Sequence, residues 1–100
     1  MELHNATLEA FEAVTGEGFR LAFDDGEELE LRLHEVRALA EQPRGNTERI
    51  PFSLLFTGPA TPILEQRIYP LEHERLGRLE IFLVPLGPVE NKIHYEAIFT

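Results

Sequence analysis

Hydrophobic and polar residues alternate along much of the chain with the period of two that is typical of a β-strand with one face in water. The clearest case is two alternating runs around an Asp25-Gly26 turn: Phe19, Leu21 and Phe23 before it, and Leu29, Leu31 and Leu33 after it. An Asp-Gly turn between two such runs is a strong signal for a β-hairpin. We therefore predict a hairpin over residues 19–34.

Further segments carry the same alternation. The apolar positions are Ile50, Phe52, Leu54 and Phe56, then Leu79, Ile81 and Leu83, and finally Ile93, Tyr95, Ala97 and Phe99. We expect the first of these strands to end at Gly58-Pro59, and the second to begin at Gly77 and to close at Pro85. Residues 68–71 form a shorter candidate strand, which Pro70 restricts to a sheet edge because proline has no N–H to donate. Residues 39–48, rich in turn formers, are expected to form a loop.

Helical spacing occurs near the N-terminus. Leu8, Phe11 and Val14 recur at intervals of three, Thr7 can cap the first turn, and Gly16 is a suitable stop. This pattern predicts a short helix within residues 7–16. Together the elements predict a mainly β fold: a small antiparallel β-barrel or sandwich of about six strands with one short N-terminal helix. Residues 1–100 are expected to form a single domain.

The composition narrows the class of protein. The chain has 100 residues, of which 43% are hydrophobic and 27% charged, as in ordinary globular proteins. It contains no cysteine, so it has no disulfides and no thiolate chemistry, which fits a reducing compartment. We find neither the segments of a secretory signal nor an apolar run close to the ~20 residues that span a bilayer. A cytoplasmic protein without a membrane partner is expected.

The net charge of −9, from 9 basic and 18 acidic residues, disfavours one class of partner. Phosphate backbones are repelled by such a chain, and no local basic patch compensates. We therefore expect no nucleic-acid binding.

A second set of apolar residues interrupts the alternation. Leu55, Phe82, Val84 and Ile98 lie on the faces opposite the main core positions. Since an outer face in water should be polar, we expect something to cover these side chains: the N-terminal helix, a loop or another subunit. These four residues are the candidate interface.

The residue types that carry catalysis or bind metals are not arranged in a recognised motif. The four histidines, His4, His34, His73 and His94, form no His-x-His pair and are interpreted as surface residues. In the cluster Glu72-His73-Glu74, neighbours on a strand point to opposite faces, and we expect Glu74 and Arg75 to form an exposed ion pair instead. The sequence thus predicts no catalytic residue, cofactor or metal site.

A small-molecule site at the mouth of a barrel is the alternative. Small barrels hold one ligand when their side chains leave a cavity. The candidate ligand-site residues, which we expect near such a mouth, are Tyr69, His73 and Tyr95.

Several segments also carry a resemblance. They read PFSLLFTGP over residues 51–59, YPLEH over 69–73, IFLVPLG over 81–87 and YEAIF over 95–99. With them the chain resembles a family of small bacterial proteins grouped as a domain of unknown function. The resemblance implies a compact stand-alone protein, transfers no catalytic residue, and suggests an accessory role in a larger, phage-tail-like assembly.

These observations favour one function class. We expect a non-enzymatic structural or protein-interaction domain that binds a partner protein, or itself as a homodimer, through the second apolar set. A small-molecule-binding barrel or minor enzyme is the alternative.

Overall fold

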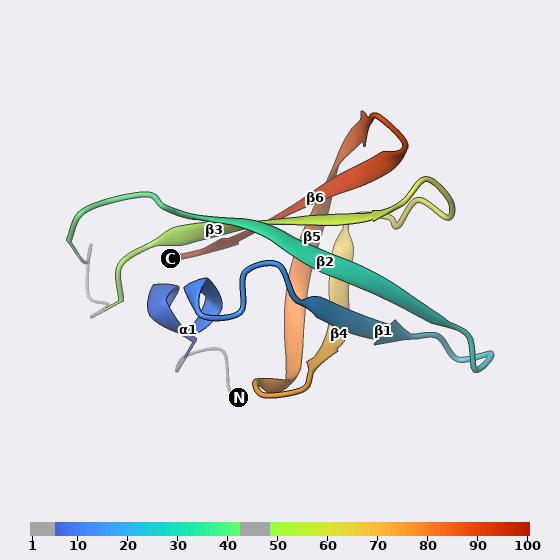
Figure 1. Cartoon of the computed structure of the whole chain (residues 1–100), viewed down its shortest axis with the longest axis horizontal. Coiled ribbons are helices and arrows are strands. Elements are labelled where there is room, and N and C mark those ends of the chain that lie inside the picture. Colours follow the sequence, from blue (N-terminus) through green and yellow to red (C-terminus); the bar gives the residue numbers. More distant parts are fainter. Residues whose placement is uncertain (1–5, 43–48) are drawn as a thin grey trace.

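Six antiparallel strands form a closed β-barrel in the computed structural model, which describes residues 6–42 and 49–100 (Figure 1). Around the barrel the strands follow the order β1-β2-β3-β6-β5-β4, and one helix, α1, precedes them. The elements are α1 Leu8–Glu12, β1 Gly18–Ala22, β2 Glu28–Ala38, β3 Phe52–Pro59, β4 Arg67–His73, β5 Gly77–Val89 and β6 Lys92–Phe99. The predicted mainly β fold is confirmed, in its barrel form.

The predicted hairpin is β1 and β2, with Phe19 opposite Leu31 and Leu21 opposite Leu29. Its turn contains Gly26 at φ +90°, a left-handed conformation that glycine adopts without strain. β2 continues to Ala38, beyond the predicted end at His34, because its second half pairs with β3.

The prediction that residues 68–71 lie at a sheet edge is wrong, because β4 pairs on both sides. It pairs with β5 along its whole length and with β1 through two residue pairs, Leu21 with Leu71 and Arg20 with Glu72. Pro70 lies next to this two-pair contact but outside it. The missing N–H therefore removes no hydrogen bond from the β1–β4 seam.

The closing position predicted for the strand that begins at Gly77 is also wrong. β5 passes through Pro85 and continues to Val89, opposite β6. A register shift between Pro85 and Gly87 inserts one extra residue and so accommodates the proline within the strand.

The barrel interior is filled by the predicted inward positions of the strands. The largest fully buried side chains among them are Phe19, Phe52, Phe56, Leu21, Leu31, Leu33, Leu54, Leu71, Leu79, Ile81 and Tyr95. Helix α1 closes one end of this core, beside the C-terminal end of β6 (Figure 1). No helix in the described part of the chain is long and apolar enough to cross a membrane.

Helix α1 is shorter than predicted, with five residues, but its predicted cap is confirmed: the Thr7 side chain accepts a hydrogen bond from the Ala10 amide at 3.2 Å. The helix attaches through Phe11, which is fully buried. The Phe11 ring lies 5.7 Å from that of Phe52 and 5.5 Å from that of Phe99, centroid to centroid. The helix therefore covers the barrel end and not the outer faces of the strands.

Substitution of Phe11 tests this role of the helix. Phe11→Ala should lower the free energy of unfolding by about 3–5 kcal/mol, because a buried aromatic side chain is removed and the barrel end loses its cover. Denaturant unfolding measures the change. The control is Glu12→Ala, at the exposed neighbouring position, which should stay within about 0.5 kcal/mol of the wild type. Equal midpoints for both variants would contradict this account of the core.

Candidate functional site

Three large apolar side chains from adjacent strands are exposed on the outer face of the barrel. Ile68 of β4 lies opposite Phe82 of β5, and both line a cleft of about 260 Å³ together with Ile98 of β6. The exposed fractions are 58% for Ile68, 48% for Phe82 and 58% for Ile98. We call these three residues the apolar patch.

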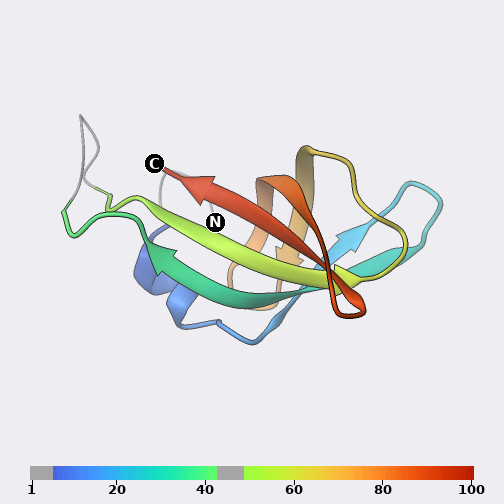
Figure 2. The ribbon, with the colours of Figure 1, turned by 90° about the horizontal axis from the view of Figure 1, so that it is seen from above.

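The cleft exists because β5 and β6 separate. Their pairing runs from Val89 opposite Lys92 to Val84 opposite Glu96 and stops there. Beyond that point β6 continues beside β3 while β5 continues beside β4, as the two views show (Figures 1 and 2). The patch thus lies where the barrel wall opens.

The four predicted interface residues do not form one stripe. Phe82 and Ile98 lie together in the patch, whereas Leu55 and Val84 are half-buried and are separated by Glu96, which pairs with both. Ile68 was not among the predicted interface residues. Because Ile68 precedes the inward-facing Tyr69 in β4, its side chain lies in the outward phase. Helix α1, one of the three expected covers of these residues, lies at the barrel end instead (Figure 1).

Beyond the patch the outer face of β4 and β5 becomes charged. Arg20 and Glu72 form an ion pair at 3.5 Å, and Arg78 and Glu80 form another at 3.2 Å. Exposed pairs of this kind contribute little to stability. They give the apolar patch a polar border on this side.

His73 is buried, so its interpretation as a surface residue is wrong. It lies in the inward phase of β4 with 4% of its surface exposed, and its ring centroid is 4.7 Å from that of Phe19. The outward positions predicted for His34 and His94 are confirmed by their exposed and half-buried side chains. His4 lies outside the described residues.

The hydrogen bonds of His73 fix its tautomer. The backbone amides of Arg75 and Leu76 donate to Nδ1 at 3.0 and 3.2 Å, so this nitrogen carries no proton. Nε2 therefore carries the hydrogen and donates it to the Glu17 carboxylate at 2.8 Å. Both nitrogens are occupied by the protein, which leaves no lone pair for general base catalysis.

Arg75 completes this cluster. Its guanidinium bonds the other Glu17 oxygen at 2.5 Å, so the predicted Glu74–Arg75 ion pair is wrong. The pairing joins residues 58 positions apart, which no local pattern could indicate. The cluster ties the turn after β4 to the segment before β1, next to the two-pair β1–β4 seam.

Tyr69 and Tyr95 hold the segment between β3 and β4. The Tyr69 hydroxyl donates to the Glu65 carbonyl at 2.6 Å, and the Tyr95 hydroxyl accepts from the Leu64 amide at 2.9 Å. Burial raises the pKa of Tyr69 above its usual value of 10.0. His73 lies at the opposite end of β4, so the structure does not gather the three predicted ligand-site residues around one pocket.

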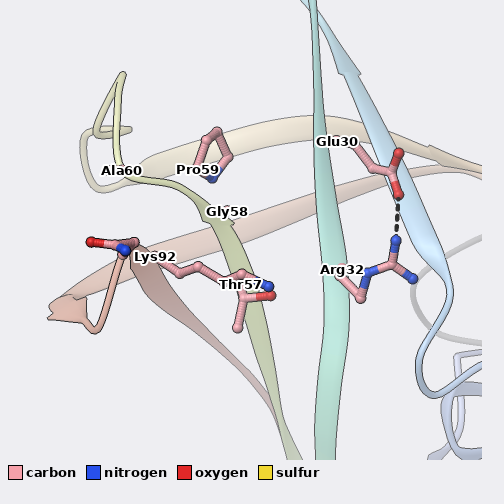
Figure 3. Close-up of a pocket in the computed structure, with 8 residues that line it drawn as sticks. Glu30, Arg32, Thr57, Gly58, Pro59, Ala60 and Lys92 are labelled. Carbon is pink, nitrogen blue, oxygen red and sulfur yellow. Dashed lines mark hydrogen bonds and ion pairs between the residues drawn. The ribbon is translucent and has the colours of Figure 1, made fainter.

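Only Tyr69 of these three lines a large groove, of about 590 Å³, formed by β4, the end of β1 and the segment before β4. A second recess, of about 330 Å³, lies beside Thr57 and Pro59 on the outer face (Figure 3). Its Arg32 donates to Glu30 at 3.2 Å and to the Gly16 carbonyl at 2.6 Å. The Arg32 guanidinium is therefore already used in hydrogen bonds within the fold.

The Glu17 cluster predicts a pH-dependent contribution to stability. The Arg75 guanidinium, and after it the His73 imidazole, hold the pKa of the Glu17 carboxyl below its usual value of 4.5. A carboxyl whose pKa is lower in the folded state stabilises the fold above the unfolded value and loses that contribution as the pH falls. Below pH 4.5 the free energy of unfolding should thus fall more steeply in the wild type than in Glu17→Gln.

Denaturant unfolding between pH 7 and pH 3 measures this difference. Since Glu17 is partly exposed, 1 M salt should reduce the gap between the two proteins. Curves that remain parallel over the whole range would contradict the assignment.

The comparisons with known proteins concern the whole barrel. No curated protein and no solved structure matches the chain. A family model described as a domain of unknown function, DUF6916, matches residues 6–99, which include α1 and all six strands. This match confirms the resemblance to a domain of unknown function. The chain belongs to the DUF6916 family.

Proposed function

We propose that this domain is a non-enzymatic protein-interaction module and that the apolar patch is its contact surface. The observation that carries the proposal is the exposure of Ile68, Phe82 and Ile98 around one cleft. An outer sheet face in water is normally polar, and apolar residues that gather on a surface mark sites where another molecule binds.

The surroundings of the patch support a protein partner. Ion pairs border it on the β4–β5 face, and an apolar centre with a polar rim is the usual anatomy of a protein–protein interface. Two copies of this chain would each bring a net charge of −9. Long-range repulsion thus favours a different partner, with a neutral or basic surface, over a homodimer.

The state of the polar groups supports a non-enzymatic role. His73, Tyr69 and Tyr95 each use their ring or hydroxyl atoms in hydrogen bonds that hold the barrel together. Catalysis needs such groups to be available to a substrate. We place the module in the cytoplasm, and an accessory role in a larger, phage-tail-like assembly forms part of the proposal.

Paired capture experiments test the contact surface. Wild type, a Phe82→Ser/Ile98→Ser variant and a Glu28→Gln control, altered at the exposed start of β2, are immobilised and exposed to extract of the native host. A partner should be retained by the wild type and by the control, and lost by the double variant. After purification of that partner, its affinity for the double variant should be at least about 30-fold lower, as expected when central interface residues are removed.

Because the Phe82 and Ile98 side chains are exposed, we expect the double variant to fold normally. An unchanged melting temperature would check this expectation. Sedimentation separates the two kinds of partner. A wild-type dimer that becomes a monomer in the double variant would assign the patch to a second copy. Equal retention of every captured protein by all three forms, with a monomeric wild type, would contradict the proposal.

The groove beside Tyr69 supports a second candidate, the binding of a small molecule. Its volume of about 590 Å³ lies within the ~300–1,000 Å³ typical of ligand sites. Apolar walls are provided by the half-buried Phe23 and the exposed Ile63.

Thermal unfolding in the presence of a metabolite panel tests the groove. A ligand should raise the melting temperature of the wild type, and Ile63→Asp, which places a charge in the groove wall, should abolish the increase. The Glu72→Gln variant, altered outside the groove, should keep it. If no compound raises the melting temperature, this candidate is excluded for the classes in the panel.

A further inference from the structure

Two histidines that are far apart in the sequence lie together on the outer face of the barrel. The ring centroids of His34, in β2, and His94, in β6, are 6.0 Å apart, and the rings are inclined at 44°. Each follows a buried core residue, Leu33 and Ile93, so each side chain points away from the core. Sequence spacing gave no indication of this pair because β3 lies between the two strands.

A bulge places His34. Leu33 lies opposite Phe56 and Glu35 opposite Leu55, so His34 is the additional residue and has no partner in β3. A bulge of this kind redirects the side chain of the extra residue. The imidazole of His34 thereby reaches over β3 toward β6.

His94 is half-buried in the outward phase of β6. It lies opposite Thr57 of β3 on one side and opposite Gly87 of β5 on the other. Gly87 has a φ of +109°, so a larger residue there would be strained. Thr57 of β3, which lies opposite His94, is only 8% exposed.

We propose that His34 and His94 form a two-imidazole site for a divalent transition-metal ion such as Cu²⁺, Ni²⁺ or Zn²⁺. Imidazole nitrogen binds these ions at about 2.0–2.1 Å, which places two ring centroids on one tetrahedral ion about 5 Å apart. The observed separation is 6.0 Å. Rotation of the exposed His34 and the half-buried His94 side chains within their rotamer wells closes a difference of about 1 Å.

Charged side chains of both signs surround the pair, including the exposed Lys92, two residues before His94 in β6. Glu35 and Glu96 lie on either side of Leu55, in the neighbouring row of the same face. Arg32, opposite Thr57, opposes a cation, but its guanidinium is held by Glu30 and the Gly16 carbonyl. Glu35 is itself paired with Arg37, so Glu96 is the carboxylate whose charge is less compensated.

The ion would keep open coordination positions. In the part of the chain that the structure describes, no three His, Cys, Asp or Glu side chains are grouped to hold a metal. Water, or a donor atom from another molecule, therefore completes the coordination. Because the two ligands come from strands on either side of β3, binding requires the folded barrel and stabilises it.

Titration calorimetry and thermal unfolding with CuCl₂, NiCl₂, ZnCl₂ and MgCl₂ test the site. We expect one equivalent of Cu²⁺, Ni²⁺ or Zn²⁺ to bind, with Cu²⁺ the tightest, and no binding of Mg²⁺, which prefers oxygen ligands. Saturation should raise the melting temperature by about 5 °C or more. His34→Ala and His94→Ala should each lower the affinity at least about 10-fold and abolish the thermal shift.

Two further variants complete the test. His4→Ala should leave binding unchanged, and so should Phe82→Ser/Ile98→Ser, which separates this site from the apolar patch. The proposal is overturned if Zn²⁺ and Ni²⁺ do not bind, if both single histidine variants retain wild-type affinity, or if binding is lost in His4→Ala.

Discussion

Closure of the barrel through a very short seam is the constraint on which the other features depend. β1 and β4 share two residue pairs, while β4 and β5 remain paired along the whole of β4. The β4–β5 hairpin must therefore lean toward β1 to close the barrel, and β5 pairs with β6 only from Val84 onward. The cluster of Glu17, His73 and Arg75 reinforces the seam from the side of the turn. The cleft and its exposed apolar residues lie where the pairing of β5 changes, because β5 pairs with β4 up to Leu83 and with β6 from Val84 onward.

The polar groups divide into two kinds according to the face on which they lie. Inside the barrel wall, His73 and Tyr95 direct their polar atoms to nearby backbone groups, which is how buried polar atoms avoid the cost of lost hydration. Outside it, the rings of His34 and His94 lie 6.0 Å apart, centroid to centroid, and in the described part of the chain no side-chain hydrogen bond holds either ring. The inner set stabilises the fold and is closed to ligands, whereas the outer set is open to them. Burial alone thus separates the histidine with a structural role from the two that can bind.

The local alternation was sufficient to predict the β1–β2 hairpin and the inward residues of β3 and β6, since these depend on the period of two within a strand. It was also sufficient, in principle, to predict the burial of His73, which shares the phase of Tyr69 and Leu71. The contacts between residues of different strands could not be predicted from the alternation. The His34–His94 pair depends on a bulge, and the grouping of Ile68 with Ile98 depends on where β5 and β6 separate. A one-residue change in either register would bring different side chains together, and a single sequence does not specify these registers.

The apolar patch and the histidine pair lie on one continuous face of β6. His94 and Ile98 are four residues apart on the same side of the strand, a distance of about 13 Å at about 3.3 Å per residue. A standard protein–protein interface buries about 800 Å² on each partner, which corresponds to a disc of about 16 Å radius. A partner centred on Ile98 would therefore extend to His94 and to the open coordination positions of an ion held there. Glu96 lies between His94 and Ile98 on this face of β6. It is half-buried and pairs with Leu55 on one side and with Val84 on the other. A basic side chain of the partner opposite Glu96 would compensate this carboxylate, so the charge of the chain and the position of the patch favour the same kind of partner surface.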